Sequence, residues 1–167
     1  MIHAATVPPT TRMLTAIGAI LTKAETHCTT RKIDPAALLT ARLFPDMFPL
    51  TRQVQLTTDF CVRAGARLSG AEVPSFPDTE TSFAELIVRT GRACDYLAAL
   101  DPGGFEGAAE RIVTIRMRGQ DVSMPGLQFL TIYALPQVYF HAATSFGILR
   151  HNGVEIGKGD YMGITAT

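Results

Sequence analysis

The sequence has few charged residues and no block of charge of either sign. Charged side chains make up 18% of the 167 residues, whereas an average soluble protein has about 25%. Fifteen Lys and Arg balance fifteen Asp and Glu, and no run of like charge is longer than two residues. Nucleic-acid binding draws most of its affinity from cations that neutralise phosphates. The missing basic stripe therefore argues against a nucleic-acid partner.

A long apolar run is also missing. The stretch Leu135–Phe140 is interrupted by Pro and Gln and is far shorter than the ~20 residues that span a bilayer. Residues Met1–Pro9 show no basic start followed by an apolar segment, as a secretory signal would. We therefore expect no membrane partner and a cytoplasmic location.

Cysteine is scarce, and Cys28, Cys61 and Cys94 form an odd set without a CxxC motif. This count does not fit a secreted disulfide framework. The apolar, helical surroundings of each cysteine predict buried free thiols in a reducing compartment. A glycine-rich phosphate loop and a nucleophile elbow are absent as well. The motifs therefore indicate no particular reaction.

Helical periodicity dominates what the sequence does contain. With 47% apolar residues, a chain of this length can fill the core of one domain. Apolar positions from Met13 to Cys28 recur at helical spacing and predict a first long helix over about Thr10–Thr30, entered at Pro8 and Pro9. The same periodicity predicts three more long helices and a short one: Leu50–Ser69, Phe83–Leu97, Leu127–His151 and Pro35–Leu39.

Several helix boundaries follow from capping chemistry. Asp34, followed by a proline, is a predicted N-cap, and Ser82 with Glu85 forms a predicted capping box. Gly70 closes the second long helix, and Pro136 should kink the last one. In the third long helix we expect an inward seam of six residues: Phe83, Leu86, Ile87, Thr90, Cys94 and Leu97.

Before the last long helix the periodicity changes from helical to alternating. Ile112–Met124 has the pattern of a β-hairpin with its turn at Arg118 and Gly119. A lone hairpin is marginal in water, so this one must lean on the bundle or on a second subunit. The predicted fold class is therefore mainly α. It is an up-down four-helix bundle, one domain over residues 1–167, with a small β-hairpin before the last helix.

Two further segments are less regular. The linker Leu43–Pro49 is too apolar for a solvated loop and should pack over one end of the bundle. The tail Val154–Thr167 is expected to be extended and partly ordered around Ile156 and Tyr161.

A set of short strings carries a resemblance to a known family. In order, they are Ala41–Gln55, Glu72–Phe76, Phe83–Leu86, Ala134–Pro136, Tyr139–His141 and Ile148–Val154. Their order and spacing resemble DUF1993, a bacterial family of unknown function that is grouped with the DinB/YfiT-like proteins. The resemblance covers nearly the whole chain and implies a four-helix bundle that is usually dimeric. The larger group is described as candidate metalloenzymes, and several of its members are thiol-dependent transferases or isomerases.

The resemblance also implies where a metal site would lie. Related proteins hold a divalent metal with three histidines, one on the second long helix and two one turn apart on the last. Here His141 matches the last of these, and Gln137 stands one turn earlier. Gln53 is the nearest counterpart on the second long helix, with Asp46 in the preceding loop. Amide oxygens are weak ligands for zinc, nickel or iron. We therefore predict that His141 is the remnant of a metal site and that no metal is tightly bound there. No cofactor is predicted, and a divalent metal is the disfavoured alternative.

His141 and Gln137 share one helical face, which leaves two interpretations open. The pair could supply a ligand or an acid–base group in an interhelical pocket, because imidazole titrates near physiological pH. Alternatively, His141 is a core histidine whose hydrogen bond is satisfied by Gln137 one turn away. We favour this structural role.

Polar residues also gather at the entry of the second long helix. Asp46 is expected to cap that helix or to pair with Arg52. Arg52 is alternatively a clamp for a substrate carboxylate, because a guanidinium group binds carboxylates in a bidentate manner. Tyr139 and Phe140 either line a ligand pocket or belong to the core.

Two functions are open at this stage. One is a non-catalytic bundle that binds a small-molecule ligand or a protein partner, retains a degenerate metal site and forms a homodimer because of its low charge fraction. The alternative is a metal-dependent thiol transferase, isomerase or hydrolase that uses an interhelical pocket around His141. The candidate pocket residues are His141, Gln137, Gln53, Asp46, Arg52 and Tyr139. Of these, Gln53, Gln137 and His141 are expected to converge between the helices.

Overall fold

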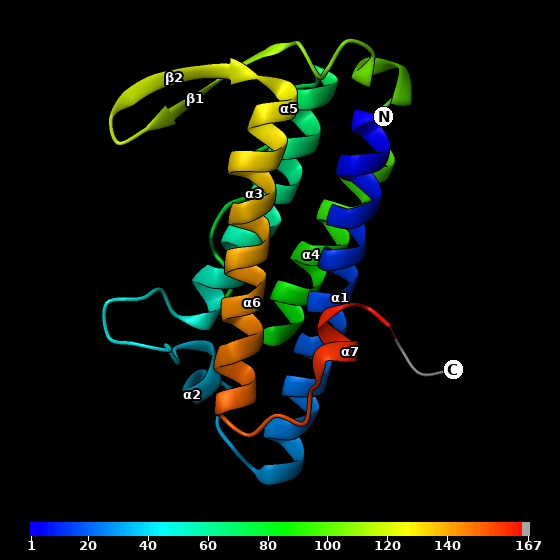
Figure 1. Ribbon diagram of the computed structural model, residues 1–167. Helices are drawn as coiled ribbons and strands as arrows, with labels where there is room; N and C mark the ends of the chain where they lie inside the picture. Colours follow the sequence, from blue (N-terminus) through cyan, green and yellow to red (C-terminus); the bar gives the residue numbers. More distant parts are fainter. Residues whose placement is uncertain (165–167) are drawn as a thin grey trace.

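Four long helices run side by side in the computed structural model, which describes residues 1–164 (Figure 1). They are α1 (Ile2–Arg31), α3 (Leu50–Ser69), α4 (Phe83–Ala98) and α6 (Leu135–His151). Shorter elements connect them: α2 (Pro35–Leu39), the 3₁₀-helix η1 (Pro102–Phe105), strands β1 (Ile112–Met117) and β2 (Gln120–Pro125), α5 (Gly126–Gln128), the π-helix η2 (Phe129–Ala134) and α7 (Lys158–Tyr161). The predicted mainly α bundle with a hairpin before its last helix is confirmed.

A shared apolar core joins the long helices. α1 packs mainly against α4, and α3 packs mainly against α6. Each long helix contributes fully buried leucines, for example Leu14, Leu50, Leu97 and Leu149. Complete burial of one such side chain is worth roughly 1.5–3 kcal/mol. The apolar stripes read from the sequence are therefore what holds the bundle together.

The helix directions depart from simple alternation at one step. Asp59 in α3 pairs with Arg89 in α4, and Gly65 lies against Leu97 further along the same two helices. Because both positions advance together, α3 and α4 run parallel. The crossover, residues 71–82, must therefore return along the bundle. An extended connection of this length reaches about 40 Å, well beyond the roughly 24 Å length of α4.

The first helix begins about two turns earlier than predicted. α1 starts at Ile2 and contains Pro8 and Pro9 instead of being entered at them. A proline inside a helix cannot donate to the carbonyl four residues back, here those of Ala4 and Ala5. Both alanines are exposed, so water can satisfy their carbonyls, while the buried Ile2 adds to the core.

The predicted helix caps are confirmed. Asp34 accepts the backbone N–H of Ala36 at 3.0 Å. The Ser82 hydroxyl accepts the N–H of Glu85 at 3.2 Å, and the Glu85 carboxylate accepts the N–H of Ser82 at 3.1 Å. Gly70 ends α3 with a φ of 78°, a left-handed conformation that costs glycine no Cβ clash.

The hairpin projects from one end of the bundle (Figure 1). β1 and β2 pair antiparallel and are joined by a two-residue turn, Arg118 and Gly119. The φ angles of these residues are 47° and 82°, and a type I′ turn requires positive values at both positions. On one face of β1, Val113 and Ile115 are buried. The same chain therefore covers this apolar face, and the hairpin needs no second subunit for support.

The disturbance expected at Pro136 takes the form of a π-helical stretch. η2 occupies Phe129–Ala134, directly before α6. Pro136 has no N–H to donate to the carbonyl of Ile132. A wider turn at this point redistributes the hydrogen bonds of the carbonyls that lose their partner.

The prediction that the linker packs over a bundle end is wrong. Phe44 and Phe48 are 63% and 53% exposed. The linker closes on itself through backbone hydrogen bonds, among them the N–H of Leu50 to the carbonyl of Ala41 at 2.9 Å. Its aromatic side chains therefore point outward.

The tail forms the short helix α7 where an extended chain was predicted. Ile156 is buried and Tyr161 is half-buried, and Lys23 of α1 fixes α7 through an ion pair with Asp160 at 2.6 Å. The rest of that prediction, residues 165–167, lies outside the described residues.

The three cysteines are free thiols. Cys28 and Cys61 are buried as predicted, whereas Cys94 is half-buried. Within residues 1–164, no helix is long and apolar enough to cross a membrane.

Candidate functional site

Gln53 on α3 and His141 on α6 meet between the two helices. Nδ1 of His141 lies 2.7 Å from Oε1 of Gln53, and the two residues are 7% and 1% exposed. α3 and α6 run antiparallel, and this contact places the first turn of α3 beside the second turn of α6. The structure thus brings two of the candidate pocket residues into direct contact.

The hydrogen bonds of Gln53 fix the tautomer of His141. Nε2 of Gln53 donates to the backbone carbonyl of Phe48 at 3.2 Å. Oε1 is therefore the atom that faces the imidazole, and Nδ1 of His141 is the donor. In a neutral ring, the second nitrogen, Nε2, then carries a lone pair.

The surroundings keep this ring uncharged. Burial, and secondarily the positive charge of Arg52, lowers the pKa of His141 from 6.5 to about 4. Phe60 stacks on the imidazole with 5.5 Å between ring centroids, and Phe140 meets it edge to face at 5.2 Å. Aromatic contacts of this kind displace the water that would solvate an imidazolium.

Nε2 of His141 opens toward the surface. It makes no hydrogen bond with any residue in the described part of the chain. Among residues 1–164, the one fully buried side-chain nitrogen or oxygen without a partner is Oγ1 of Thr11, so Nε2 is not sealed in the core. It can accept a hydrogen bond from a molecule at the surface.

The interpretation that Gln137 satisfies His141 is wrong. The partner of Nδ1 is Gln53 on the facing helix, and Gln137 is half-buried. Tyr139 stands two residues before His141, about 200° around the helix, and so lies on another face of α6. Its side chain is exposed.

Asp46 and Arg52 do not form the predicted pair. Asp46 is exposed, and the N-cap of α3 is Pro49, without a side-chain hydrogen bond. The expectation that Asp46 caps this helix or pairs with Arg52 is therefore wrong. Arg52 instead forms an ion pair with Asp78 and donates to Oε1 of Gln55 at 3.2 Å. Its guanidinium group is thus occupied by a carboxylate of the same chain.

A buried arginine, Arg89 of α4, lies at the centre of a larger polar network. It is 1% exposed and pairs with Asp59 of α3 at 2.6 Å. It also pairs with two carboxylates of the crossover, Asp78 at 3.1 Å and Glu80 at 2.9 Å. The remaining partners of its guanidinium group are Oγ1 of Thr58 at 2.7 Å and the carbonyl of Pro77 at 3.0 Å.

The network joins the crossover to both parallel helices. Gln55 of α3 donates to Glu80 at 2.9 Å, and Arg63 pairs with Asp59 at 3.0 Å. Three arginines face three carboxylates, so the charges balance. Because these groups satisfy one another, the network is structural and leaves no free acid or base for chemistry.

The sequence carried a signal for Arg89 that the seam prediction missed. Arg89 follows Leu86 by three positions and precedes Ala93 by four, and all three are buried. Ile87 and Cys94, which were assigned to the seam, are half-buried. A charged residue at the spacing of a buried stripe predicts a buried ion pair.

The residues around His141 do not fit a divalent transition metal. Nδ1 is committed to Gln53, and the neighbouring groups are neutral amides, which are poor ligands for such ions. In the described range 1–164, no group of three or more His, Cys, Asp or Glu side chains is placed to hold a metal ion. We therefore assign no metal chemistry to this site.

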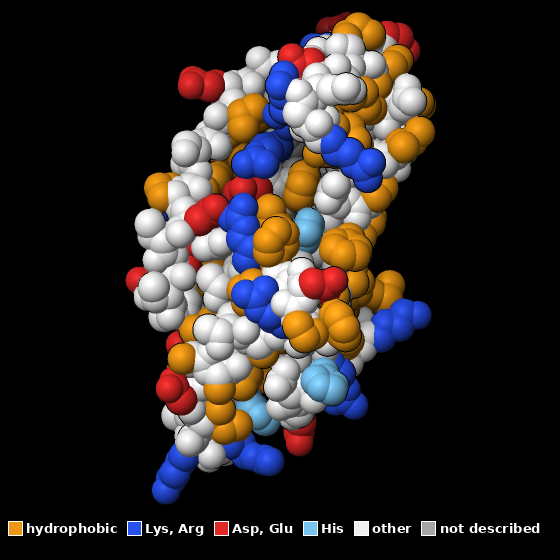
Figure 2. Space-filling model, turned by 90° about the vertical axis from the view of Figure 1, so that its left-hand side faces the viewer, with side chains coloured by type: hydrophobic (Ala, Val, Ile, Leu, Met, Phe, Trp, Pro, Cys, Tyr) orange, Lys and Arg blue, Asp and Glu red, His pale blue; other side chains and the backbone are white. Residues whose placement is uncertain are grey.

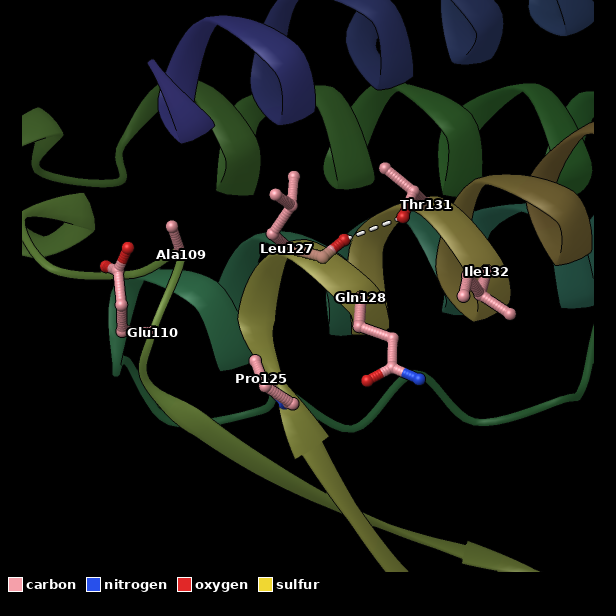
Figure 3. A pocket seen from close by; sticks show the side chains of 7 residues that line it. All are labelled: Ala109, Glu110, Pro125, Leu127, Gln128, Thr131 and Ile132. Carbon is pink, nitrogen blue, oxygen red and sulfur yellow. Dashed lines mark hydrogen bonds between the residues drawn. The ribbon is translucent and has the colours of Figure 1, made fainter.

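A separate cleft of about 500 Å³ lies at the base of the hairpin (Figure 3). Glu110 and Pro125 line it from the hairpin side, and Leu127 and Ile132 line it from α5 and η2. Ile132 precedes His141 by nine residues, about 14 Å along a helix. The cleft is therefore distinct from the Gln53–His141 site.

The parallel α3–α4 pair, the hairpin and the interhelical polar site define a DinB-like helical bundle. A crystal structure of a DinB family member protein from Shewanella denitrificans is similar over 100% of this chain and 93% of that chain, with a TM-score of 0.91 and 38% sequence identity. The family model described as domain of unknown function DUF1993 matches residues 2–162. The chain belongs to the DUF1993 family, as the sequence resemblance predicted. No curated protein matches it.

Proposed function

We propose that this protein is a non-catalytic binding protein whose small-molecule ligand donates a hydrogen bond to Nε2 of His141. The observation that carries this proposal is the bond from Nδ1 to Gln53, which leaves Nε2 as the open acceptor. A general base works best with a pKa near the operating pH. With a pKa of about 4, His141 is a weak base at neutral pH but remains a good hydrogen-bond acceptor.

The ligand class follows from the groups around Nε2. Phe140 is 56% exposed beside the imidazole, and Phe60 stacks on it, so an apolar or aromatic body is favoured. The nearby charge of Arg52 disfavours a cation. The ligand we propose is an uncharged aromatic or apolar molecule with one O–H or N–H donor.

Phenol is a suitable probe, and anisole is its matched control because methylation removes the O–H donor and adds a single methyl group. In an NMR titration, phenol should shift the Nε2 resonance of His141 saturably and anisole should not. The variant His141→Phe keeps an aromatic ring in the packing and should lose the phenol site. Equal binding of the two probes, or unchanged phenol binding by His141→Phe, would contradict the proposal.

The alternative, a metal-dependent thiol transferase, isomerase or hydrolase, is tested on the same protein. After incubation with zinc and exhaustive dialysis, we expect well below one zinc per chain, because two glutamines cannot replace two imidazoles as ligands. Stoichiometric zinc that is lost in His141→Ala would overturn the binding proposal in favour of this alternative.

We further propose that the protein acts in the cytoplasm as a homodimer. Four large apolar side chains, here called the apolar face, are exposed on α6, η2 and the linker: Phe44, Phe48, Ile132 and Phe140. Figure 2 shows hydrophobic side chains gathered over the right-hand half of this side of the molecule. Exposed apolar patches often mark interaction sites, and a second copy would cover this one through a two-fold contact. Because Phe140 also borders the proposed ligand site, that site would then lie at the edge of the dimer contact. Three free thiols favour a reducing compartment.

A further inference from the structure

A second pocket, of about 350 Å³, lies between the end of α6 and α7. Ala143, Phe146 and Arg150 of α6 form one wall, and Lys158 and Tyr161 of α7 stand opposite. The volume falls within the roughly 300–1,000 Å³ that small-molecule sites occupy. His141 is two residues from Ala143, about 200° around the helix, so this α6–α7 pocket lies on a different face from the Gln53 contact.

The inner part of the α6–α7 pocket is apolar. Phe146 and Tyr161 pack edge to face with 5.9 Å between ring centroids, and Ile156 beside them is buried. Burial also raises the pKa of the Tyr161 hydroxyl. An aromatic or branched aliphatic group would lose its hydration against these side chains, which favours its binding.

Two positive charges line the same pocket without a carboxylate partner. Arg150 and Lys158 are exposed, and neither forms an ion pair or a side-chain hydrogen bond with any residue of the range 1–164. The acid of α7, Asp160, is already engaged, because it pairs with Lys23 and accepts the N–H of Gly157 at 2.8 Å. The dipole of α6 accounts for Arg150 in its last turn but not for Lys158, the first residue of α7.

The walls of the pocket are fixed before any ligand arrives. The Lys23–Asp160 ion pair ties α7 to α1. Arg12, also on α1, donates from Nε to the carbonyl of Met162 at 2.8 Å. Because these contacts hold α7 in place, a ligand would not need to order it, which lowers the entropic cost of binding.

We propose that the α6–α7 pocket binds a small amphipathic carboxylate. The guanidinium group of Arg150 can bind the carboxylate through two parallel hydrogen bonds, and Lys158 supplies the second positive charge. The apolar part of the ligand packs on Phe146 and Tyr161. This site is separate from the one proposed at His141 and takes a charged ligand where that one takes a neutral donor.

Calorimetric titration with 4-phenylbutyrate tests the proposal. Methyl 4-phenylbutyrate, which has neither a charge nor an O–H or N–H donor, is the control for the carboxylate, and acetate is the control for the apolar part. We expect one phenylbutyrate site per chain and at least about tenfold weaker binding of either control. Arg150→Gln and Lys158→Gln should each weaken phenylbutyrate binding by about tenfold. Arg92→Gln, which removes an exposed arginine of α4, should leave it unchanged.

A second variant keeps the charges and fills the space. Ala143→Leu places three more carbons in the pocket from an exposed position and should block phenylbutyrate without unfolding the chain. Binding of methyl 4-phenylbutyrate as tight as that of the acid, or unchanged affinity in both charge variants, would overturn the proposal. His141→Phe should bind phenylbutyrate normally, and loss of binding there would place the acid at the other site and overturn it as well.

Discussion

A histidine held by a neutral amide behaves differently from one held by a carboxylate. A carboxylate would stabilise the imidazolium and raise its pKa, which suits a general base. Gln53 accepts the Nδ1–H of His141 without supplying that charge, so burial dominates and the pKa falls to about 4. At the scale of this residue pair, the amide of Gln53 therefore leaves His141 neutral at physiological pH, with Nε2 as a hydrogen-bond acceptor.

The lowered pKa of His141 makes a prediction about stability. In the unfolded chain His141 binds a proton below about pH 6.5, whereas in the folded chain it does so only below about pH 4. The free energy of unfolding should therefore fall by about 1.4 kcal/mol for each pH unit of acidification within this window. Above pH 6.5 this contribution is fully retained. Between pH 7 and pH 5, the wild type should lose about 2 kcal/mol more than His141→Gln.

Urea unfolding of both proteins at the two pH values measures this difference. All other titrating groups are common to the two chains, so they cancel in the comparison. Parallel losses of stability in the wild type and His141→Gln would show that the histidine is not held neutral.

The predicted convergence of Gln53 and His141 is confirmed, but Gln137 had been expected as the hydrogen-bond partner of His141. A residue one turn away is always close, so Gln137 was the partner that local spacing offered. The choice of Gln53 depends on how α3 and α6 are aligned across the bundle, and that alignment is set by the core of four helices. Such tertiary information is not present in any local pattern.

At the scale of elements, the parallel α3–α4 pair makes the crossover the unusual part of this bundle. Residues 71–82 place the half-buried Phe76 against the core and are held mainly by polar contacts. Arg89 binds Asp78 and Glu80 of the crossover from one side, and Phe76 lies under Arg89 at 5.6 Å and under Arg92 at 5.1 Å. One buried guanidinium group therefore fastens a connection that runs along two helices.

Replacing Arg89 by methionine should destabilise the protein by about 3–5 kcal/mol, because it strands buried carboxylates. Arg92→Met is the matched control, since Arg92 also contacts Phe76 but is exposed, and it should cost less than about 1 kcal/mol. Chemical denaturation gives both values. In Arg89→Met, limited proteolysis should cut the crossover first. Equal stability of the two variants would refute the fastening role.

Several helix ends could be predicted from local chemistry, whereas the arrangement of the helices in space could not. The caps at Asp34 and Ser82 depend on residues within one turn of each other, so a short window contains the whole cause. The direction of α4 depends on packing between segments that are distant in the sequence. The early start of α1 shows the same limit, because two prolines are tolerated where their carbonyl partners face water.

At the scale of the whole molecule, the apolar face predicts self-association. Light scattering should give twice the 18.0 kDa chain mass at micromolar concentration. The double variant Ile132→Glu with Phe140→Glu should be monomeric, since like charges would meet across a two-fold contact. Val88→Glu alters another exposed apolar residue, on α4, and should remain dimeric. A wild-type protein that stays monomeric at all concentrations would contradict this assembly.

The most direct test of the central claim is a nitrogen-15 NMR spectrum of the imidazole ring of His141, recorded from pH 8 to pH 5. The proposed site requires a protonated Nδ1 and an unprotonated Nε2. Because the pKa is about 4, both resonances should be constant from pH 8 to about pH 6 and should show only about a tenth of the full titration shift at pH 5. Gln53→Glu should raise that pKa into the measured range, since a carboxylate stabilises the imidazolium. A wild-type ring that titrates near pH 6.5, or that carries its proton on Nε2, would contradict the account.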